Sequence, residues 1–133
     1  MLVALPFSHR LTRRRRHVHL AELGDQAWIG ADTGADDRLL GPARLARAIG
    51  SDFPVREWTA KLGLVAAGLG VTLVPSLAAQ AVRADVALLP LDRSDAPPRT
   101  VYAATLHERT PAPAVKAFID VLRQTAKQIA APA

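Results

Sequence analysis

Short apolar runs alternate with helical patterns along the whole chain, and this alternation constrains the fold more than any other feature of the sequence. Runs rich in Val, Leu and Ala at positions 2–5, 71–74 and 86–91 are typical of short buried strands. Pro6 and Pro75 close the first two of these runs. Because strands alternate with helices, we expect an α/β fold whose sheet includes parallel pairings.

Weaker strand patterns occur at three further places, positions 27–29, 53–57 and 100–106. The polar and basic residues 8–17 are typical of a loop. Residues 20–23, which Gly24 follows, predict one helical turn with a C-terminal glycine.

Helical patterns fill the remaining central segments of the chain. Apolar residues at helical spacing predict a helix over 58–67 that ends at Gly68. A shorter helix is expected over 42–49, before Gly50. Residues 76–80 predict another short helix, whose leading serine is a suitable N-cap.

The C-terminal segment has the most regular periodicity. Apolar residues recur there every three or four positions and predict one apolar stripe on a helix of several turns, formed by Val115, Phe118, Ile119, Leu122, Ala126 and Ile129. Such a stripe is unusual on the surface of a monomer. We therefore expect it to pack against a second chain or to fold back on this one, with an oligomer interface formed by Phe118, Ile119, Leu122 and Ile129.

The composition argues against several functional classes. The chain has no cysteine, which excludes disulfides, thiolate zinc sites and a cysteine nucleophile and fits a reducing cytoplasm. It also lacks a Gly-x-Ser-x-Gly elbow and a phosphate-binding loop, and Gly68–Gly70 lacks the third glycine of a dinucleotide fingerprint. No apolar run approaches roughly 18 residues, and no secretory signal precedes His9. We expect a cytoplasmic protein without enzymatic activity, cofactor or membrane contact.

Positive charge is concentrated in one run, Arg13–Arg16, within a chain of formal net charge +5. The run lacks the interleaved aromatic residues of a nucleic-acid site, so we expect a solvated loop. His17 and His19 have the spacing of a metal-binding pair, and Glu22 is nearby. Since no further ligands cluster there, we expect no metal site.

Five segments of the chain follow one another in an order that is typical of a known family. Residues 64–75 form the helix–glycine–strand block LVAAGLGVTLVP. Residues 3–11 are similar to a crossover strand and a His-x-Leu loop, and residues 17–29 to a short helix and strand. The segments 86–91 and 99–104 and the helix after Pro111 come next. Together they resemble the effector-binding domain of LysR-type transcriptional regulators.

This resemblance implies a fold like that of the type 2 periplasmic binding proteins, with an effector in the cleft between two lobes. It identifies residues 1–133 as a partial effector-binding domain, in which about 7–106 form the second lobe and 107–133 a return segment and C-terminal helix. Nothing in the chain resembles the winged helix-turn-helix that precedes this domain in full-length relatives. We therefore expect a truncated protein that does not itself bind DNA and that binds effector weakly or not at all when alone.

Two loops are the best candidates for effector contacts. The first follows the strand at 27–29, at the carboxyl end of a strand, and includes Gly30, Asp32 and Thr33. We expect Thr33 and the backbone N–H groups of this loop to hold a carboxylate. The second is Trp58-Thr59 at a helix N-terminus, which favours anions and offers a ring for stacking. Core packing is an equally good interpretation of the Trp58 side chain, as it is of Trp28.

These observations predict the effector-sensing domain of a LysR-type regulator that forms a homo-oligomer, with a dimer as the simplest form. A small-molecule effector, for which a carboxylate is a reasonable guess, would close the lobes and shift the arrangement of the oligomer. A standalone oligomerisation or decoy module without a working effector site is the alternative. A secreted solute-binding protein and a basic nucleic-acid binder are less favoured.

Overall fold

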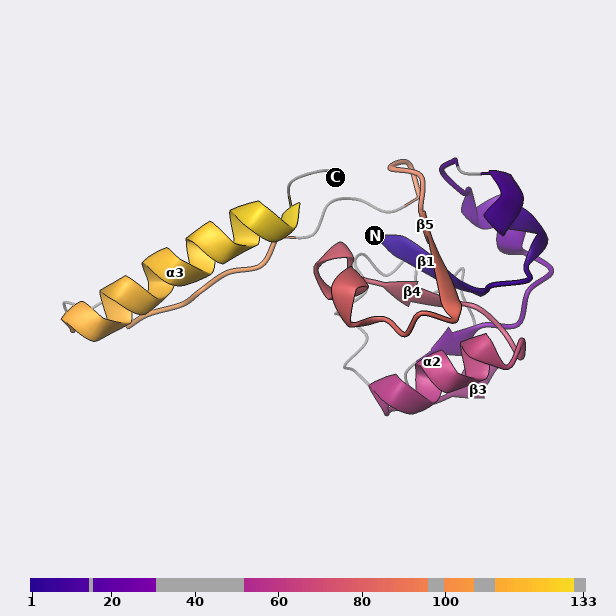
Figure 1. The fold of residues 1–133 in the computed structure, drawn as a ribbon, viewed down its shortest axis with the longest axis horizontal. Helices are drawn as coiled ribbons and strands as arrows, with labels where there is room; N and C mark the ends of the chain where they lie inside the picture. Colours follow the sequence, from indigo (N-terminus) through magenta and orange to yellow (C-terminus); the bar gives the residue numbers. More distant parts are fainter. Residues whose placement is uncertain (15, 31–51, 96–99, 107–111, 131–133) are drawn as a thin grey trace. The chain divides into compact units, whose positions relative to one another are not determined.

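The computed structural model of the chain describes residues 1–14, 16–30, 52–95, 100–106 and 112–130 (Figure 1). The chain divides into an N-terminal unit, Met1–Pro98, and a C-terminal unit, Arg99–Ala133. Each unit is described by itself below.

A three-stranded antiparallel sheet forms the centre of the N-terminal unit, beside a two-stranded parallel sheet. Strand β1 (Leu2–Pro6) lies between β4 (Thr72–Val74) and β5 (Val86–Pro90) and runs antiparallel to both. Strand β2 (Ile29–Gly30) pairs in parallel with β3 (Phe53–Pro54). The predicted parallel pairing is therefore present, alongside an antiparallel centre that the sequence did not reveal.

Two parallel bridges extend this arrangement. Trp28 pairs with Val71 beside β4, and Val18 pairs with Leu91 at the end of β5. Strands β2, β3, β4 and β5 consequently all run in one direction, opposite to β1. Their carboxyl ends point to the same edge of the unit, which is where ligands bind in open α/β sheets.

Strand β1 is central because it is apolar on both faces. Val3, Ala4 and Leu5 are fully buried, and successive side chains point to opposite sides of the sheet. One side of the core contains Val3, Leu5, Leu11, Val18, Leu23, Trp28, Val71, Leu73, Leu89 and Leu91. The other contains Ala4, Ile29, Leu62, Val65, Val74 and Val86.

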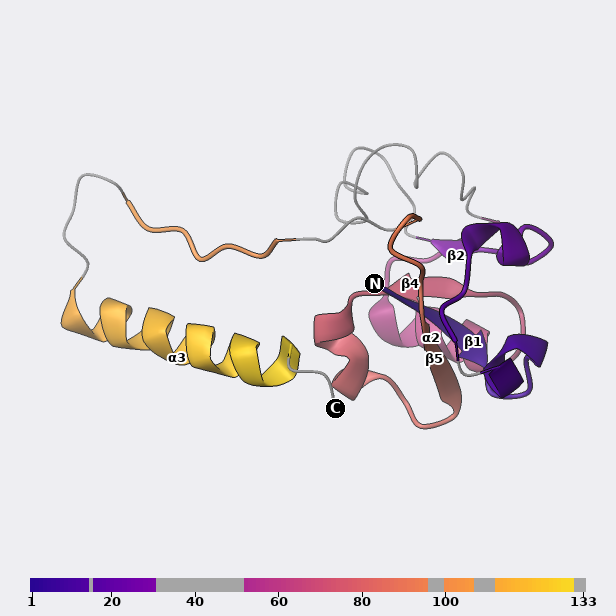
Figure 2. The same cartoon turned by 90° about the horizontal axis from the view of Figure 1, so that it is seen from above.

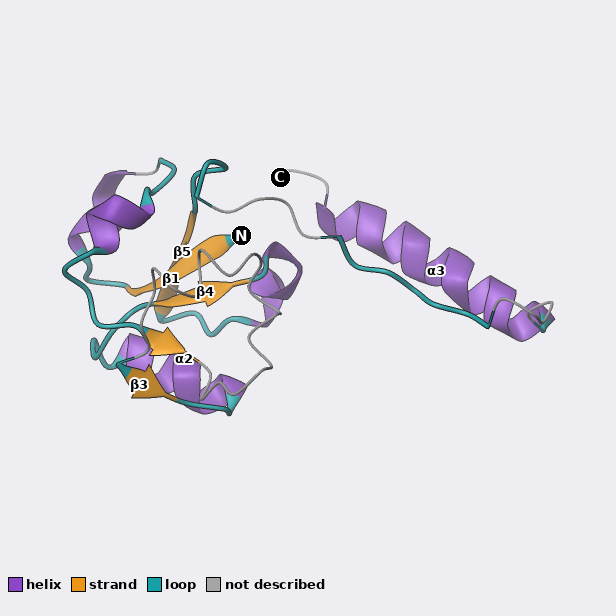
Figure 3. Ribbon diagram, turned by 180° about the vertical axis from the view of Figure 1, so that it is seen from behind, coloured by secondary structure: helices purple, strands orange, loops and turns teal. Residues whose placement is uncertain are grey.

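Helices cover the two faces of this sheet (Figure 3). Helix α2 (Trp58–Ala66) buries Leu62 and Val65 in the core cluster that contains Ala4. On the other side, the 3-10 helices η1 (Arg10–Arg14) and η2 (Leu20–Leu23) contribute Leu11 and Leu23. A third 3-10 helix, η4 (Ser76–Ala81), follows β4.

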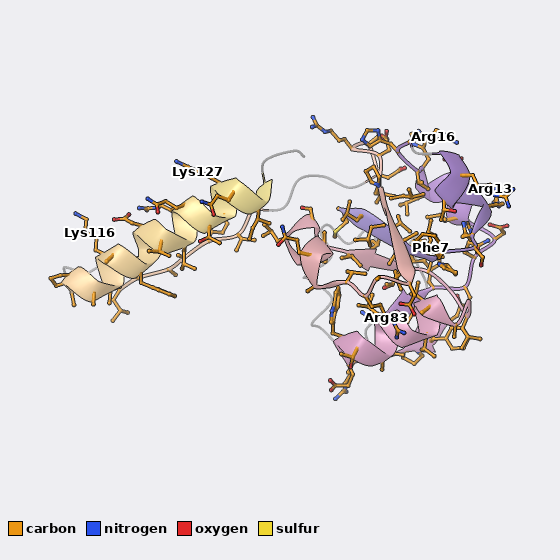
Figure 4. The ribbon with its side chains drawn as sticks, in the orientation of Figure 1. Phe7, Arg13, Arg16, Arg83, Lys116 and Lys127 are labelled. Atoms are coloured by element: carbon orange, nitrogen blue, oxygen red, sulfur yellow. The ribbon has the colours of Figure 1, made fainter. Side chains whose placement is uncertain are left out.

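The segment expected to be a loop, residues 8–17, contains helix η1. Its turn forms because the Thr12 hydroxyl donates to the carbonyl of His9 at 2.7 Å and because Leu11 is buried beneath it. Arg13 and Arg16 are nevertheless exposed, as expected for the basic run (Figure 4).

Gly24 is the C-cap of η2, as predicted, and has a helical φ of −65°. Two other local details differ from the expectations. Ser76 is the first residue of η4 and not its cap; Pro75 occupies the N-cap position. The predicted strand at 100–106 has no ladder partner among the described residues, and all its side chains are exposed. The expected helix at 42–49 lies outside the described residues.

The C-terminal unit contains helix α3 (Pro113–Ala130), which confirms the predicted C-terminal helix. Segment 100–106 runs in the direction opposite to α3 (Figures 1 and 2). None of the residues in the two core clusters belongs to this unit.

Candidate functional site

Strands β2 and β3 bring two distant segments together at the carboxyl edge of the sheet. Ile29 pairs with Phe53, and Gly30 pairs with Pro54. The backbone N–H of Val55 then donates to the carbonyl of Gly30 at 2.8 Å. Since α2 begins three residues after Val55, the candidate residue Gly30 and the N-terminus of α2 lie at the same edge. We call Gly30, Val55, Trp58 and Thr59 the carboxyl-edge site.

Hydrogen bonds from three segments hold β2 in place. The N–H of Ile29 donates to the carbonyl of Val71 at 2.9 Å, and the buried Thr72 hydroxyl donates to the carbonyl of Ile29 at 2.6 Å. The Asp52 carboxylate accepts the N–H of Trp28 at 2.8 Å. These bonds position Gly30, and neither Asp52 nor Thr72 was identified from the sequence. The only sequence feature that could have indicated the role of Asp52 is its place directly before strand β3.

The N-terminus of α2 has the chemistry of an anion site. Glu57 at the N-cap has extended backbone angles and makes no side-chain capping bond, and the first turn contains no acidic residue. The first-turn N–H groups of a helix have no intrahelical partner and attract negative charge. Glu57 itself places a carboxylate beside them, which weakens this attraction.

The predicted effector residues occupy different environments. Gly30 and Trp58 are half-buried, and the Trp58 side chain packs against the core cluster on the α2 side of the sheet. Thr59 is exposed one residue further along α2. Asp32 and Thr33 lie outside the described residues. Trp28 is a core residue, which agrees with the packing interpretation of that side chain.

A polar cluster lies at the carboxyl end of β5. The Asp95 carboxylate accepts the N–H of Leu20 at 3.0 Å and lies 3.3 Å from Nδ1 of His19. Asp92 accepts two hydrogen bonds from Ser94, from its hydroxyl and its N–H, and these lower the pKa of the Asp92 carboxyl. The cluster therefore joins η2 to the turn after β5. The sequence analysis did not identify this contact between segments 75 residues apart.

His19 and Glu22, which were considered as metal ligands, have other partners. Glu22 accepts the N–H of His19 at 3.1 Å and pairs with the Arg16 guanidinium. The hydrogen bond from Arg16, followed by that from His19, lowers the pKa of the Glu22 carboxyl. Within the described ranges, His, Asp and Glu side chains form no group of three that could hold a metal.

Acid is expected to remove the stabilisation that Arg16 provides through Glu22. Because the folded pKa of Glu22 lies below the value of 4.5 for an unperturbed glutamate, this contribution is complete above pH 4.5 and is lost as the pH falls through the folded value. Arg16→Ala should raise the pKa toward 4.5 and flatten this part of the stability profile. Thermal unfolding followed from about pH 7 to about pH 3 measures the difference.

Arg123→Ala serves as the matched control, since Arg123 contacts Asp120 on α3. Its unfolding midpoints should follow the pH dependence of the parent chain. The same acid response in all three proteins would contradict the assigned role of Arg16.

Comparison with known proteins gives a consistent result. The chain matches the family model of the LysR substrate binding domain over residues 1–127. It is also similar to the probable HTH-type transcriptional regulator LrrA of Synechococcus elongatus, with 36% identity over 83 residues. These residues are 59% of this chain and 26% of that protein. The chain thus matches about a quarter of the length of this curated relative.

Solved structures of effector-binding domains have the same fold. The effector binding domain of QuiR in complex with shikimate is 26% identical, with a TM-score of 0.61, and the match covers 96% of this chain and 61% of that one. The BenM effector binding domain with its effector benzoate is 22% identical, with a TM-score of 0.67. This match covers 98% of this chain and 62% of that one. The regulatory domain of Synechocystis PCC6803 CcmR in complex with 2-PG has a TM-score of 0.64 at 19% identity, and the match covers 95% of this chain and 62% of that domain.

These matches confirm the predicted periplasmic-binding-protein-like α/β fold. The matched family is one of transcriptional regulators and not an enzyme family, in agreement with the sequence analysis. In the part of the chain that the structure describes, no helix is long and apolar enough to cross a membrane. The chain belongs to the LysR substrate-binding domain family.

Proposed function

We propose that the carboxyl-edge site contributes to the recognition of a small carboxylate effector by a cytoplasmic LysR-type regulator. One observation carries this proposal: the parallel pairing of β2 with β3 brings Gly30 and the N-terminus of α2 to the same edge of the sheet. A carboxylate would accept hydrogen bonds from the first-turn N–H groups and from the Thr59 hydroxyl. The half-buried Trp58 ring would form an apolar wall beside it.

The ligands of two similar structures support the choice of chemistry. Shikimate and benzoate, which are bound to the QuiR and BenM domains, are both small carboxylates built on a six-membered ring. Asp32 and Thr33, which follow Gly30 in the sequence, remain candidates for effector contacts and lie outside the described residues. The assignment of about 7–106 to the second lobe and of 107–133 to a return segment stays a prediction.

The proposed mechanism is a shift between conformations. An effector that contacts both walls of a cleft binds the closed form more tightly and so increases its population. In a homo-oligomer this closure would change how the subunits are arranged. Because the chain spans only 61–62% of the QuiR and BenM domains, we expect this stretch alone to bind more weakly than a full-length domain.

Thr59→Ala is expected to weaken carboxylate binding several-fold, because a hydrogen bond from the exposed Thr59 hydroxyl contributes about 0.5–1.5 kcal/mol. Benzoate and shikimate are the probes, and chemical-shift perturbation of the ¹⁵N-labelled chain reports both the affinity and the place of binding. Shifts should be concentrated at Gly30 and in the first turn of α2.

Thr125→Ala on α3 is the matched control and should leave the titration unchanged. Perturbations confined to residues away from the carboxyl-edge site, or an unchanged affinity in Thr59→Ala, would contradict this assignment. Cyclohexane methanol tests the role of charge, since it retains a six-membered ring but has no carboxylate.

A separate observation supports the alternative function, an oligomerisation or decoy module. Eight of the twelve exposed large hydrophobic residues in the described part of the chain belong to the C-terminal unit. The expected interface residues Phe118, Leu122 and Ile129 are among them, and Ile119 is half-buried. A homo-oligomer is compatible with both functions.

A further inference from the structure

Strand β2 has β3 on one side and the segment that leads into β4 on the other. On the β3 side, the carbonyl of Trp28 accepts the N–H groups of Asp52 and Phe53, at 2.9 and 3.1 Å. The carbonyl of Gly30 accepts the N–H of Val55 at 2.8 Å. Backbone bonds therefore hold this edge of β2 as far as Gly30.

The opposite edge of β2 has a shorter backbone ladder. The N–H of Val71 donates to the carbonyl of Ala27, and the carbonyl of Val71 accepts the N–H of Ile29, both at 2.9 Å. In a regular parallel pair, the next bond would run from the N–H of Leu73 to the carbonyl of Ile29. The described residues make no such bond, and the bridge between Trp28 and Val71 is isolated. The backbone ladder on this side thus ends at the N–H of Ile29.

The Thr72 hydroxyl takes the place of the next ladder bond. It donates to the carbonyl of Ile29 at 2.6 Å. Thr72 is 2% exposed, and it is the only buried polar residue in the part of the chain that the structure describes. A buried carbonyl that loses its donor is not compensated by water, so the loss costs the full desolvation of that group. The Ile29 carbonyl therefore depends on this one hydroxyl.

The position of Thr72 in β4 explains why its side chain makes this bond. Thr72 pairs with Ala4 of β1 in the antiparallel ladder. The backbone groups of Val71 face β2, and successive residues of a strand direct these groups to opposite edges. The backbone of Thr72 therefore faces β1, and only its side chain can reach β2.

The two ends of this contact are built differently. At its start, Gly70 allows close approach of the backbones, since a Cβ there would lie 2.6 Å from the carbonyl oxygen of Ala27. At its end, the Thr72 hydroxyl makes the last bond before Gly30 on this side. The position of the carboxyl end of β2 thus depends on a single side chain.

We propose that Thr72 is a positioning residue of the carboxyl-edge site. The C=O of Ile29 and the N–H of Gly30 belong to one planar peptide and point in opposite directions. By holding that carbonyl on the β4 side, the hydroxyl turns the Gly30 N–H toward β3 and keeps Gly30 paired with Pro54. Thr72 acts through this peptide and not through contact with the effector. The inference rests on the proposed carboxylate function, but its central test needs no ligand.

Hydrogen exchange of the Val55 amide tests this role in the free protein. Its bond to the Gly30 carbonyl protects that amide, so its exchange reports whether Gly30 stays on β3. Thr72→Val removes the hydroxyl with little change in shape. It should accelerate exchange at Val55 about tenfold more than exchange at the amides of β1. Thr72→Ser retains the hydroxyl and should keep the parent ratio of the two rates.

Thr12→Val is the matched control, because it removes a similar bond away from the site. The Thr12 hydroxyl donates to the carbonyl of His9 at 2.7 Å in η1. A general loss of stability accelerates exchange at Val55 and in β1 by similar factors. The ratio of the two rates should therefore stay at the parent value in Thr12→Val.

Carboxylate binding provides a second measurement, with benzoate and shikimate as probes under conditions where every variant is folded. Affinity should fall about fivefold or more in Thr72→Val, since a typical hydrogen bond contributes about 1 kcal/mol. It should remain within about twofold of the parent in Thr72→Ser and Thr12→Val. A side chain that only stabilised the fold would leave all three affinities unchanged.

Equal acceleration at Val55 and in β1 in the Thr72→Val chain would overturn the proposal, as would selective loss of Val55 protection in Thr72→Ser. Thr72→Ala, which removes the hydroxyl without adding volume, replaces Thr72→Val if that variant does not fold. The two proposals fail separately. If neither the parent nor any variant binds a carboxylate while Val55 responds as expected, the effector assignment fails and the role of Thr72 in placing Gly30 stands.

Discussion

Gly70→Ala is expected to lower the free energy of unfolding by about 2–3 kcal/mol, because a side chain at this position has no room. A Cβ on Gly70 would lie 2.6 Å from the carbonyl oxygen of Ala27 and 3.1 Å from Cγ1 of Ile29. That carbonyl accepts the N–H of Val71 at 2.9 Å, so relief of the clash requires β2 to move away from β4. Urea unfolding followed by circular dichroism measures the loss.

Two other glycines provide controls for this result. Gly24 has a helical φ, and its nearest new contact is 3.6 Å away, so Gly24→Ala should be neutral or stabilise by up to about 1 kcal/mol. Gly68 has open space around it but a φ of 77°, so Gly68→Ala should cost about 1–2 kcal/mol from backbone strain alone. If Gly70→Ala lowered the free energy of unfolding no more than Gly68→Ala does, the backbone at Ala27 would be able to move away from the added Cβ.

Leu5→Ala is expected to destabilise the N-terminal unit by about 2–5 kcal/mol. Leu5 is fully buried in the central strand, where its side chain packs in the core cluster with Leu11 and Leu23. Truncation removes this packing and leaves a cavity that a strand paired on both sides cannot collapse to fill. The loss is a large fraction of the 5–15 kcal/mol that is typical of a domain.

Leu106→Ala is the control for this substitution. The exposed Leu106 side chain contributes nothing to either core cluster, so its removal should change the stability by less than about 0.5 kcal/mol. The comparison is made at low protein concentration, where association between chains does not contribute. Similar losses for both variants would mean that Leu106 is buried in the folded chain.

The two stability predictions also bear on the candidate site. Gly70 directly precedes Val71, whose N–H donates to the carbonyl of Ala27 and whose carbonyl accepts the N–H of Ile29. Gly70→Ala should therefore disturb Gly30 and weaken carboxylate binding even under conditions where the chain remains folded. Leu5→Ala acts from the other side of the sheet and should affect binding only through stability.

Local patterns in the sequence determined which segments become strands and helices in the N-terminal unit. The alternation of apolar runs with helical spacing predicted β1, β5 and α2 to within a residue or two, because the burial of a strand or helix face depends on residues close in sequence. The order of five segments, of which residues 64–75 are one, also predicted the effector-binding fold.

Only the tertiary structure decided which segments meet. The antiparallel position of β1 between β4 and β5, the bond from Asp52 to Trp28 and the contact of His19 with Asp95 all join residues far apart in the chain. No periodicity encodes such partners. Segment 100–106 shows the same limit: its residues favour a strand, but a strand exists only where a second one supplies its hydrogen bonds.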